Sequence, residues 1–196
     1  RVLYINAAHL QVFQHLLENN SPIDAADVYA KLALATDNLY SDIKHVIRKE
    51  LFSYLPPFKA APMSLGLNYS IFEKIILSAK KSTEYDFIIV DTDTTFDEKK
   101  ASLLSIANKV LIITKQDLTS VFATNILVSN INEVDTEKYI FICNNFDKDE
   151  ENVLVSPHIP LKFTIDHYVD HFRYCENMNP DDLSQESNIQ KIAFLI

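Results

Sequence analysis

The residues best suited to chemistry in this sequence are polar side chains that follow short apolar runs. Asn6 follows one such run, Asp91-Thr92-Asp93 and Thr114-Lys115 follow two more, and Asn144-Asn145 closes a fourth. Asp91 comes directly after Phe87-Ile88-Ile89-Val90, and a carboxylate at the end of a rigid strand can hold a hydrated Mg²⁺ beside nucleotide phosphates. The plainer interpretation is that these are turn residues, because any strand leaving a sheet must end in something polar.

The elements that would position these side chains are three continuous apolar runs. They cover residues 87–90, 110–113 and 139–142, and helical patterns at about 97–107 and 117–131 separate them. Buried parallel strands joined by right-handed crossovers have this pattern, with helices on both faces of the sheet. We therefore predict one domain over residues 1–196, an α/β fold with three α/β/α layers and a mostly parallel sheet. Ligands of such sheets bind at the carboxyl ends of the strands.

The other elements follow from apolar spacing and from proline positions. Strands are predicted at residues 2–5, 51–55 and 161–165. Helices are predicted at about 10–17, from Pro22 onward, and at 39–47, 69–79, 167–176 and 184–195. We expect the last of these to dock on the core, since it carries one Lys and lacks a basic face for a membrane.

Composition narrows the function. The net charge of −9 argues against nucleic acid as a partner, because phosphate-backbone binding needs clustered Lys and Arg. Gly66 is the one glycine of the chain, so no glycine-rich phosphate loop lies within these residues. No stretch is long and apolar enough to predict a membrane span. Two cysteines favour a reducing, cytoplasmic compartment.

Residues Tyr85 to Thr92 have the pattern of a Walker B strand, and the order of elements around them resembles the ParA/MinD family of P-loop ATPases. Asn144-Asn145-Phe146-Asp147 is similar to that family's Asn-x-x-Asp segment, and Ile159-Pro160-Leu161 to its short Ile-Pro strand. The resemblance implies a Rossmann-like P-loop NTPase fold that binds ATP and Mg²⁺ and dimerises around nucleotide. It places Asp91 beside the metal and Asn144 beside adenine. The candidate cofactor-binding residues are therefore Asn6, Asp91, Thr92, Asn144 and Asp147.

The departures from the family are equally informative. The phosphate loop is missing, and we expect the family's first strand, phosphate loop and first helix to precede Arg1. Asn6 and Ala8 stand where the family has aspartates after its second strand, and neither can act as a base. Asp93-Thr94-Thr95 replaces the usual Pro-Gly. We predict a degenerate member with weak nucleotide binding, no catalytic residue among those singled out, and poor or no hydrolysis.

Within that family, the segment from Asp27-Val28-Tyr29 to Phe52-Ser53-Tyr54-Leu55 and Pro57 looks like the TadZ/CpaE-type proteins. That resemblance implies a bacterial, cytoplasmic protein that acts in protein localisation or in pilus or secretion assembly. Protein partners would recruit it to the inner membrane or the cell pole.

Two alternatives to this function stay open. A receiver-like signalling domain would use Asp91 as phosphoacceptor and Thr114 as the hydroxyl residue, although Asn6-Ala7 lacks the expected acidic pair and Asn144 replaces the expected lysine. An active partitioning ATPase would have its phosphate loop upstream of Arg1, although the acidic charge disfavours its binding to DNA.

A metal site is a further hypothesis for the sequence near the C-terminus. His167, His171 and Cys175 would share one face of the predicted helix at 167–176. Three such ligands span about 12 Å of a straight helix, which is too far for one ion. We therefore predict a partly buried helix face with hydrogen-bonded imidazoles and no metal.

Overall fold

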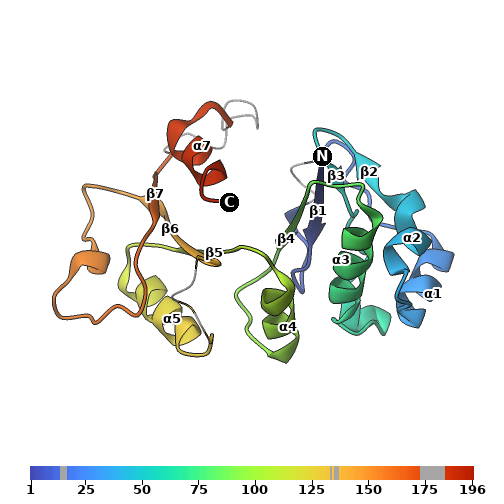
Figure 1. Ribbon diagram of the computed structural model, residues 1–196, viewed down its shortest axis with the longest axis horizontal. Coiled ribbons are helices and arrows are strands. Elements are labelled where there is room, and N and C mark those ends of the chain that lie inside the picture. Colours follow the sequence, from blue (N-terminus) through green and yellow to red (C-terminus); the bar gives the residue numbers. More distant parts are fainter. Residues whose placement is uncertain (14–16, 133, 135–136, 173–183) are drawn as a thin grey trace. The chain divides into compact units, whose positions relative to one another are not determined.

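The computed structural model describes the whole chain except residues 14–16, 133, 135–136 and 173–183 (Figure 1). The chain forms two compact units, residues 1–103 and 104–196. Each unit is built around its own sheet, and each sheet is mostly parallel. The predicted α/β class is confirmed.

The first unit contains a four-stranded sheet in the order β2-β3-β1-β4. Its strands are β1 (Val2–Asn6), β2 (Arg48–Lys49), β3 (Ser53–Tyr54) and β4 (Phe87–Asp91). β1 pairs in parallel with both β3 and β4, and β2 pairs antiparallel with β3. Alternate side chains of β1 point into the core, and those of Leu3 and Ile5 are completely buried. The central position of β1 brings its carboxyl end beside that of β4.

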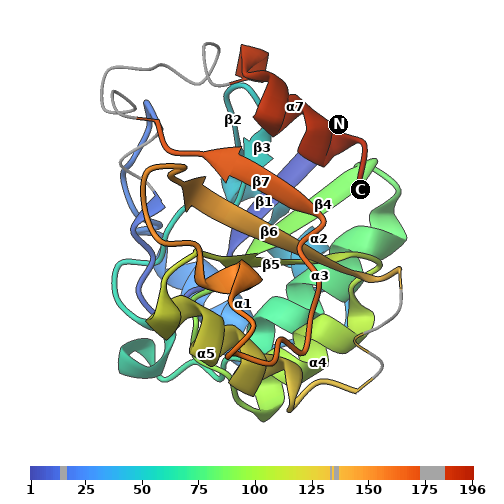
Figure 2. The same ribbon diagram turned by 90° about the vertical axis from the view of Figure 1, so that its left-hand side faces the viewer.

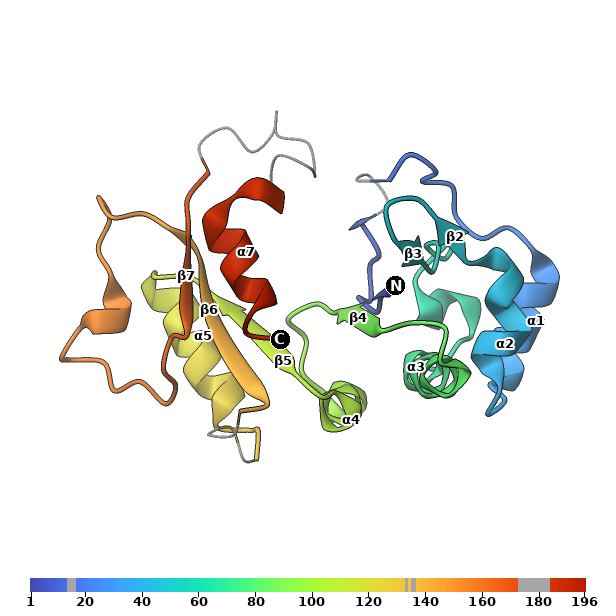
Figure 3. The same cartoon turned by 45° about the horizontal axis from the view of Figure 1, so that its top comes forward.

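The helices of the first unit are α1 (Ala26–Leu34), α2 (Leu39–Ile43) and α3 (Ile71–Ser82), with 3-10 turns at Lys44–Val46 and Pro62–Leu65. α2 packs against both α1 and α3, and the three lie side by side in Figure 3. Their facing side chains, among them Tyr40, Phe72 and Ile75, are fully buried. Helix α4 (Glu98–Ile106) follows β4 and contributes Lys100 to this unit.

The second unit contains three parallel strands in the order β5-β6-β7 (Figure 2). They are β5 (Val110–Thr114), β6 (Tyr139–Phe146) and β7 (His167–Asp170). Helix α5 (Leu118–Val128) and the 3-10 turn Val153–Val155 pack on one face. Helix α7 (Ser187–Ala193) packs on the other through Ile189 and Ile192. This unit therefore has three layers (Figure 3), and the predicted docking of the last helix on the core is confirmed.

Two predictions near the C-terminus are wrong. Residues 161–165 form no strand, and residues 167–170 form strand β7 rather than the start of a helix. Residues 167–170 are extended because they pair with β6, where Ile142 and Cys143 align with His167 and Tyr168. The four-residue spacing of the histidines only resembled a helix. The rest of the predicted helix, from residue 173, lies outside the described residues.

Three smaller differences concern strands and the first helix. β6 continues through Phe146, four residues beyond the predicted run, because β7 supplies a partner for the extension. β4 is the edge strand of its sheet, and its Phe87 and Ile89 side chains are 56% and 50% exposed. The burial that was expected of all three apolar runs is therefore seen in β6 but not in β4. The helix predicted over 10–17 falls partly on residues 14–16, outside the described residues, and Leu10 and Leu17 are not helical.

Candidate functional site

Three of the candidate residues meet at the carboxyl edge of the first sheet. Asn6 is the last residue of β1 and lies opposite Asp91, the last residue of β4. The backbone N–H of Ala7 donates to the carbonyl oxygen of Asp91 at 2.7 Å, which extends the pairing by one step. Thr92 follows and is exposed. Parallel pairing therefore brings together residues that stand 85 positions apart in the sequence.

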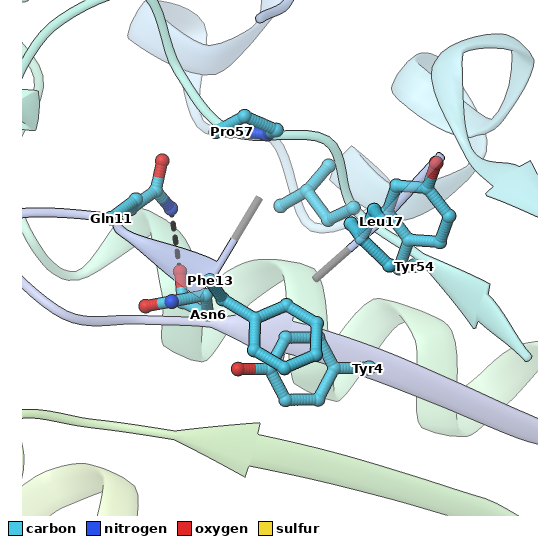
Figure 4. Close-up of a pocket in the computed structure, with 8 residues that line it drawn as sticks. Tyr4, Asn6, Gln11, Phe13, Leu17, Tyr54 and Pro57 are labelled. Carbon is cyan, nitrogen blue, oxygen red and sulfur yellow. Dashed lines mark hydrogen bonds between the residues drawn. The ribbon is translucent and has the colours of Figure 1, made fainter. Parts of the chain in front are cut away.

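The Asn6 amide shapes the loop after β1. Its side chain is buried, and its Oδ1 accepts from the backbone N–H of Ala8 at 2.9 Å. Gln11 donates to the Asn6 carbonyl, as Figure 4 shows, and accepts from the backbone N–H of Phe58 at 2.7 Å. The cavity beside these residues measures about 10 Å³, which is room for one water molecule. A nucleotide base cannot enter it.

Asp91 is exposed and is the carboxylate best placed for a cation. The Tyr4 hydroxyl donates to its Oδ2 at 2.9 Å. Burial of the phenol, together with this hydrogen bond, raises the pKa of Tyr4, so the hydroxyl stays protonated and remains a donor. Within the described residues Tyr4 is the one donor to this carboxylate, which leaves Oδ1 open to Mg²⁺.

Asp93, two residues further on, has both carboxylate oxygens bound by other groups of the protein. Its Oδ1 pairs with the ammonium of Lys100 and accepts from the backbone N–H of Thr95 at 3.0 Å. Its Oδ2 accepts from the backbone N–H of His9 at 2.7 Å and lies 2.9 Å from His9 Nδ1. Burial alone would raise the pKa of Asp93, but these hydrogen bonds, led by that of Lys100, outweigh it and hold the pKa well below its usual range. Asp93 is therefore an anchor within the protein.

Lys100 and His9 were not singled out from the sequence, and both prove central to this edge. Lys100 is 4% exposed, and its ammonium also donates to the Asp93 carbonyl at 2.8 Å. From the sequence, a lysine in a helical segment is expected to face solvent. The ion pair between Lys100 and Asp93 can therefore be identified only from the tertiary structure. The neighbouring Asp97 caps α4 by accepting from the Lys100 backbone N–H at 2.9 Å.

The other two candidates, Asn144 and Asp147, belong to the second unit. Asn144 is exposed, and within the described residues its side-chain amide makes no hydrogen bond. It borders a groove of about 360 Å³ whose other lining side chains are apolar: Ile113, Ile142, Val169, Phe172, Ile189 and Ile192. An apolar groove with one free amide suits a flat heteroaromatic ring that needs a few hydrogen bonds.

Asp147 follows β6 and is held by Gln116, a residue that the sequence did not single out. Gln116 is 4% exposed and accepts from the backbone N–H of Asp147 at 2.7 Å. Its amide nitrogen donates to the carbonyls of Asp147 at 3.0 Å and Glu151 at 3.1 Å. The Asp147 carboxylate closes the turn by accepting from the backbone N–H of Asp149. One buried amide thus fixes both ends of the acidic loop.

The histidines near the C-terminus have partners other than a metal. His167 Nε2 lies 2.7 Å from the carbonyl of Asn188, and His171 Nδ1 pairs with the Asn145 side chain. Cys175 lies outside the described residues. Among the residues that the structure describes, no group of three His, Cys, Asp or Glu could hold a metal ion. Any Mg²⁺ bound through Asp91 would complete its coordination with water and ligand oxygens.

Mostly parallel strands with polar residues at their carboxyl ends define an open α/β sheet of the kind that binds ligands at that edge. More narrowly, the chain has the fold of the ParA/MinD-type ATPases. A protein of Borrelia burgdorferi B31 assigned to plasmid partition and bound to AMPPNP matches with a TM-score of 0.63 and 16% identity, over 98% of this chain and 85% of that one. A ParA family ATPase from Chlorobium tepidum TLS matches with a TM-score of 0.60 and 19% identity, over 76% of this chain. MinD in the MinC:MinD cell division complex of Aquifex aeolicus matches with a TM-score of 0.51 and 22% identity, over 74% of this chain.

The match spans 62% of the Chlorobium protein and 56% of the Aquifex protein. No protein-family model and no curated protein matches the sequence. Among the described residues, none of the helices has the length and apolar character required to cross a bilayer.

Proposed function

We propose that this chain is a degenerate ParA/MinD-like ATPase domain that binds nucleotide weakly and hydrolyses it poorly. The observation that carries the proposal is the edge shared by β1 and β4, where Asn6 lies opposite Asp91. By the family resemblance, Asp91 would take the metal-side position, and Asn6 and Ala8 would stand where the family has aspartates. The Asn6 amide is neither basic nor free, because its oxygen already accepts from Ala8. This supports retained binding with impaired water activation.

The proposed ligand is ATP with Mg²⁺. In the first unit, Asp91 would hold a hydrated Mg²⁺ through its open oxygen, with Thr92 beside it. In the second unit, taken by itself, Asn144 would meet a nucleotide base at the mouth of its apolar groove. Asp147, in the loop that Gln116 holds, would contribute to nucleotide binding from the same unit as Asn144. The phosphate contacts would come from a strand, loop and helix preceding Arg1, so that residues 1–196 form most of one ParA/MinD-like domain. The AMPPNP bound to the Borrelia protein supports nucleotide as the ligand class.

The cellular role we propose is protein localisation, or pilus or secretion assembly, of the TadZ/CpaE type in bacteria. The chain would act from the cytoplasm through protein partners that bring it to the inner membrane or the cell pole, and it would form a homodimer. The neighbour that is itself in complex with MinC supports a protein partner. The net charge of −9 favours proteins over nucleic acid.

A second candidate is an active partitioning ATPase with its phosphate loop upstream of Arg1. One observation favours it: the Borrelia protein assigned to plasmid partition matches nearly the whole of this chain. Salt-dependent binding to non-specific duplex DNA together with fast hydrolysis would support this candidate, and the absence of DNA binding would support the first.

The test is calorimetric titration of the chain with ATP and Mg²⁺, followed by a phosphate-release assay. We expect weak binding that Asp91→Asn reduces only when Mg²⁺ is present and that Asn144→Ala reduces with or without it. Asp37→Asn is the matched control, since Asp37 is an exposed carboxylate in the same unit as Asp91. Lack of nucleotide binding, or equal binding by Asp91→Asn and wild type with Mg²⁺, would refute the proposal. A labile adduct on Asp91 after incubation with acetyl phosphate would instead support the receiver alternative.

A further inference from the structure

We propose that His9 and Asp93 form a general-base dyad that carries the slow nucleotide hydrolysis remaining in a site where Asn6 and Ala8 cannot act as a base. The inference rests on the proposed function, because its substrate is the nucleotide bound at the same edge of the first sheet. It adds a catalytic residue, His9, and two positioning residues, Asp93 and Lys100, to a site in which neither Asn6 nor Ala8 can act as a base.

The geometry of the pair is that of an oriented imidazole. The Asp93 Oδ2 lies 2.9 Å from His9 Nδ1 and also accepts from the His9 backbone N–H at 2.7 Å. A carboxylate at this distance holds the proton on Nδ1 and leaves the lone pair on Nε2. The His9 side chain is 42% exposed, and no described residue hydrogen-bonds to Nε2, so that nitrogen is open to water.

Stacking on Tyr69 also fixes the imidazole ring in place. Its plane stacks on the ring of Tyr69, with centroids 4.9 Å apart and an interplanar angle of 17°. The Tyr69 hydroxyl in turn donates to the carbonyl of Ala7, the first residue after β1. The ring is therefore held by the loop that carries it and by the residues that precede α3.

The carboxylate is fixed from the other side. Lys100, buried in the first half of α4, donates to both the Asp93 carboxylate and the Asp93 carbonyl, and the Thr95 backbone N–H donates to the same carboxylate. This network holds Asp93 in one orientation while its second oxygen stays with His9. A carboxylate anchored in this way orients an imidazole without itself taking the proton.

The dyad lies at the carboxyl edge of the first sheet, where we propose that the nucleotide binds. His9 comes one residue after Ala8, in the loop that follows β1, and Asp93 comes two residues after Asp91. In the proposed step His9 Nε2 removes a proton from water as the water oxygen bonds to the γ-phosphorus of ATP. The bond from that phosphorus to the bridging oxygen breaks, and ADP leaves with the electron pair. Inorganic phosphate is released, and His9 later returns its proton to solvent.

The experiment compares the wild-type chain with His9→Ala in ATP binding and in phosphate release. We expect equal nucleotide affinity and a loss of hydrolysis of about 100-fold, the usual contribution of a general base. Free imidazole added to His9→Ala should restore part of the rate, because the partly exposed site admits it, and a purely structural role would not allow this rescue. His45→Gln, an exposed histidine of the same unit, is the matched control and should hydrolyse at the wild-type rate.

A second readout does not depend on turnover. Nitrogen-15 NMR of the imidazoles should show the proton of neutral His9 on Nδ1 in the wild type, and Asp93→Asn should lose that preference. Nucleotide binding without hydrolysis, hydrolysis unaffected by His9→Ala, or a neutral His9 protonated on Nε2 would overturn the dyad alone. Failure of the wild type to bind nucleotide would refute the proposed function, and the dyad's role with it.

Discussion

The ion pair between Asp93 and Lys100 should respond unequally to the loss of its two members. Asp93→Ala leaves the buried ammonium with the Asp93 carbonyl as its remaining acceptor, and it strips the backbone N–H groups of Thr95 and His9 of their partner. Removing one member of a buried pair costs about 3–5 kcal/mol of unfolding free energy. The Asp93 side chain is 29% exposed, so we expect the lower half of that range.

Lys100→Met should cost less, because Asp93 keeps three other donors: the backbone N–H groups of His9 and Thr95 and the His9 imidazole. Methionine also preserves the packing of the lysine stem. We expect about 1–2 kcal/mol, the cost of one lost charged hydrogen bond after that packing is kept.

The assay is equilibrium urea unfolding followed by circular dichroism, with hydrogen exchange of the β1 and β4 amides as a probe of the first unit alone. The double variant Asp93→Ala with Lys100→Met should be more stable than Asp93→Ala, since it no longer buries an unpaired ammonium. If Lys100→Met is as destabilising as Asp93→Ala, or if the two losses simply add, the ion pair does not hold this edge together and the reasoning fails.

Three further outcomes are expected. Because the pKa of Asp93 is lowered in the folded protein, its contribution to stability is complete above the unfolded value of about 3.9 and is lost as the pH falls below it, so the acid limb of a stability-against-pH curve should flatten in Asp93→Asn. Gln116→Leu removes the acceptor of the Asp147 N–H and the donor to the Glu151 carbonyl, while the Asp147 carbonyl keeps the Glu150 N–H, and it should cost about 1–3 kcal/mol by urea unfolding. Gln190→Leu on an exposed face of α7 should stay within about 0.5 kcal/mol. Gly66→Ala should cost about 1 kcal/mol in thermal unfolding, since Gly66 has φ +69° and an added Cβ meets no atom within 4 Å, so that a much larger loss would indicate packing rather than backbone strain.

The fold class was largely predictable because three apolar runs and the helical patterns between them indicate parallel strands, although β4 joins one sheet and β5 and β6 join the other. Residues 87–90, 110–113 and 139–142 all became strands, and the Asn6–Asp91 pairing follows from two parallel strands that end together. Prediction failed where local pattern and tertiary pairing disagree. His167 and His171 have helical spacing, yet residues 167–170 form β7, because β6 offers a free edge to this segment.

The two-residue strand β2 shows the same limit. Arg48–Lys49 is charged and carries no apolar alternation, so periodicity cannot find it. It is held by antiparallel pairing with Ser53–Tyr54 and by Glu50, whose carboxylate accepts from the Tyr54 hydroxyl at 2.6 Å. Contacts of this kind form between side chains that come together only in the folded protein, so the local sequence pattern does not predict them.

The site residues fall into two groups in the same way. Some can be identified from the sequence because they end a strand, and others are identified only from contacts in the folded protein. Asp91 could be singled out because it terminates an apolar run. Its neighbour Asp93 could be singled out too. The sequence could not show that the Asp93 carboxylate pairs with Lys100 and His9 and is therefore not available to bind a metal. His9 stands 84 residues from Asp93, next to an Asn and two Ala residues that read as the loss of a catalytic loop. A base absent from its usual position therefore predicts slow hydrolysis rather than none, since under our proposal a histidine oriented by a carboxylate from another strand still accepts the proton.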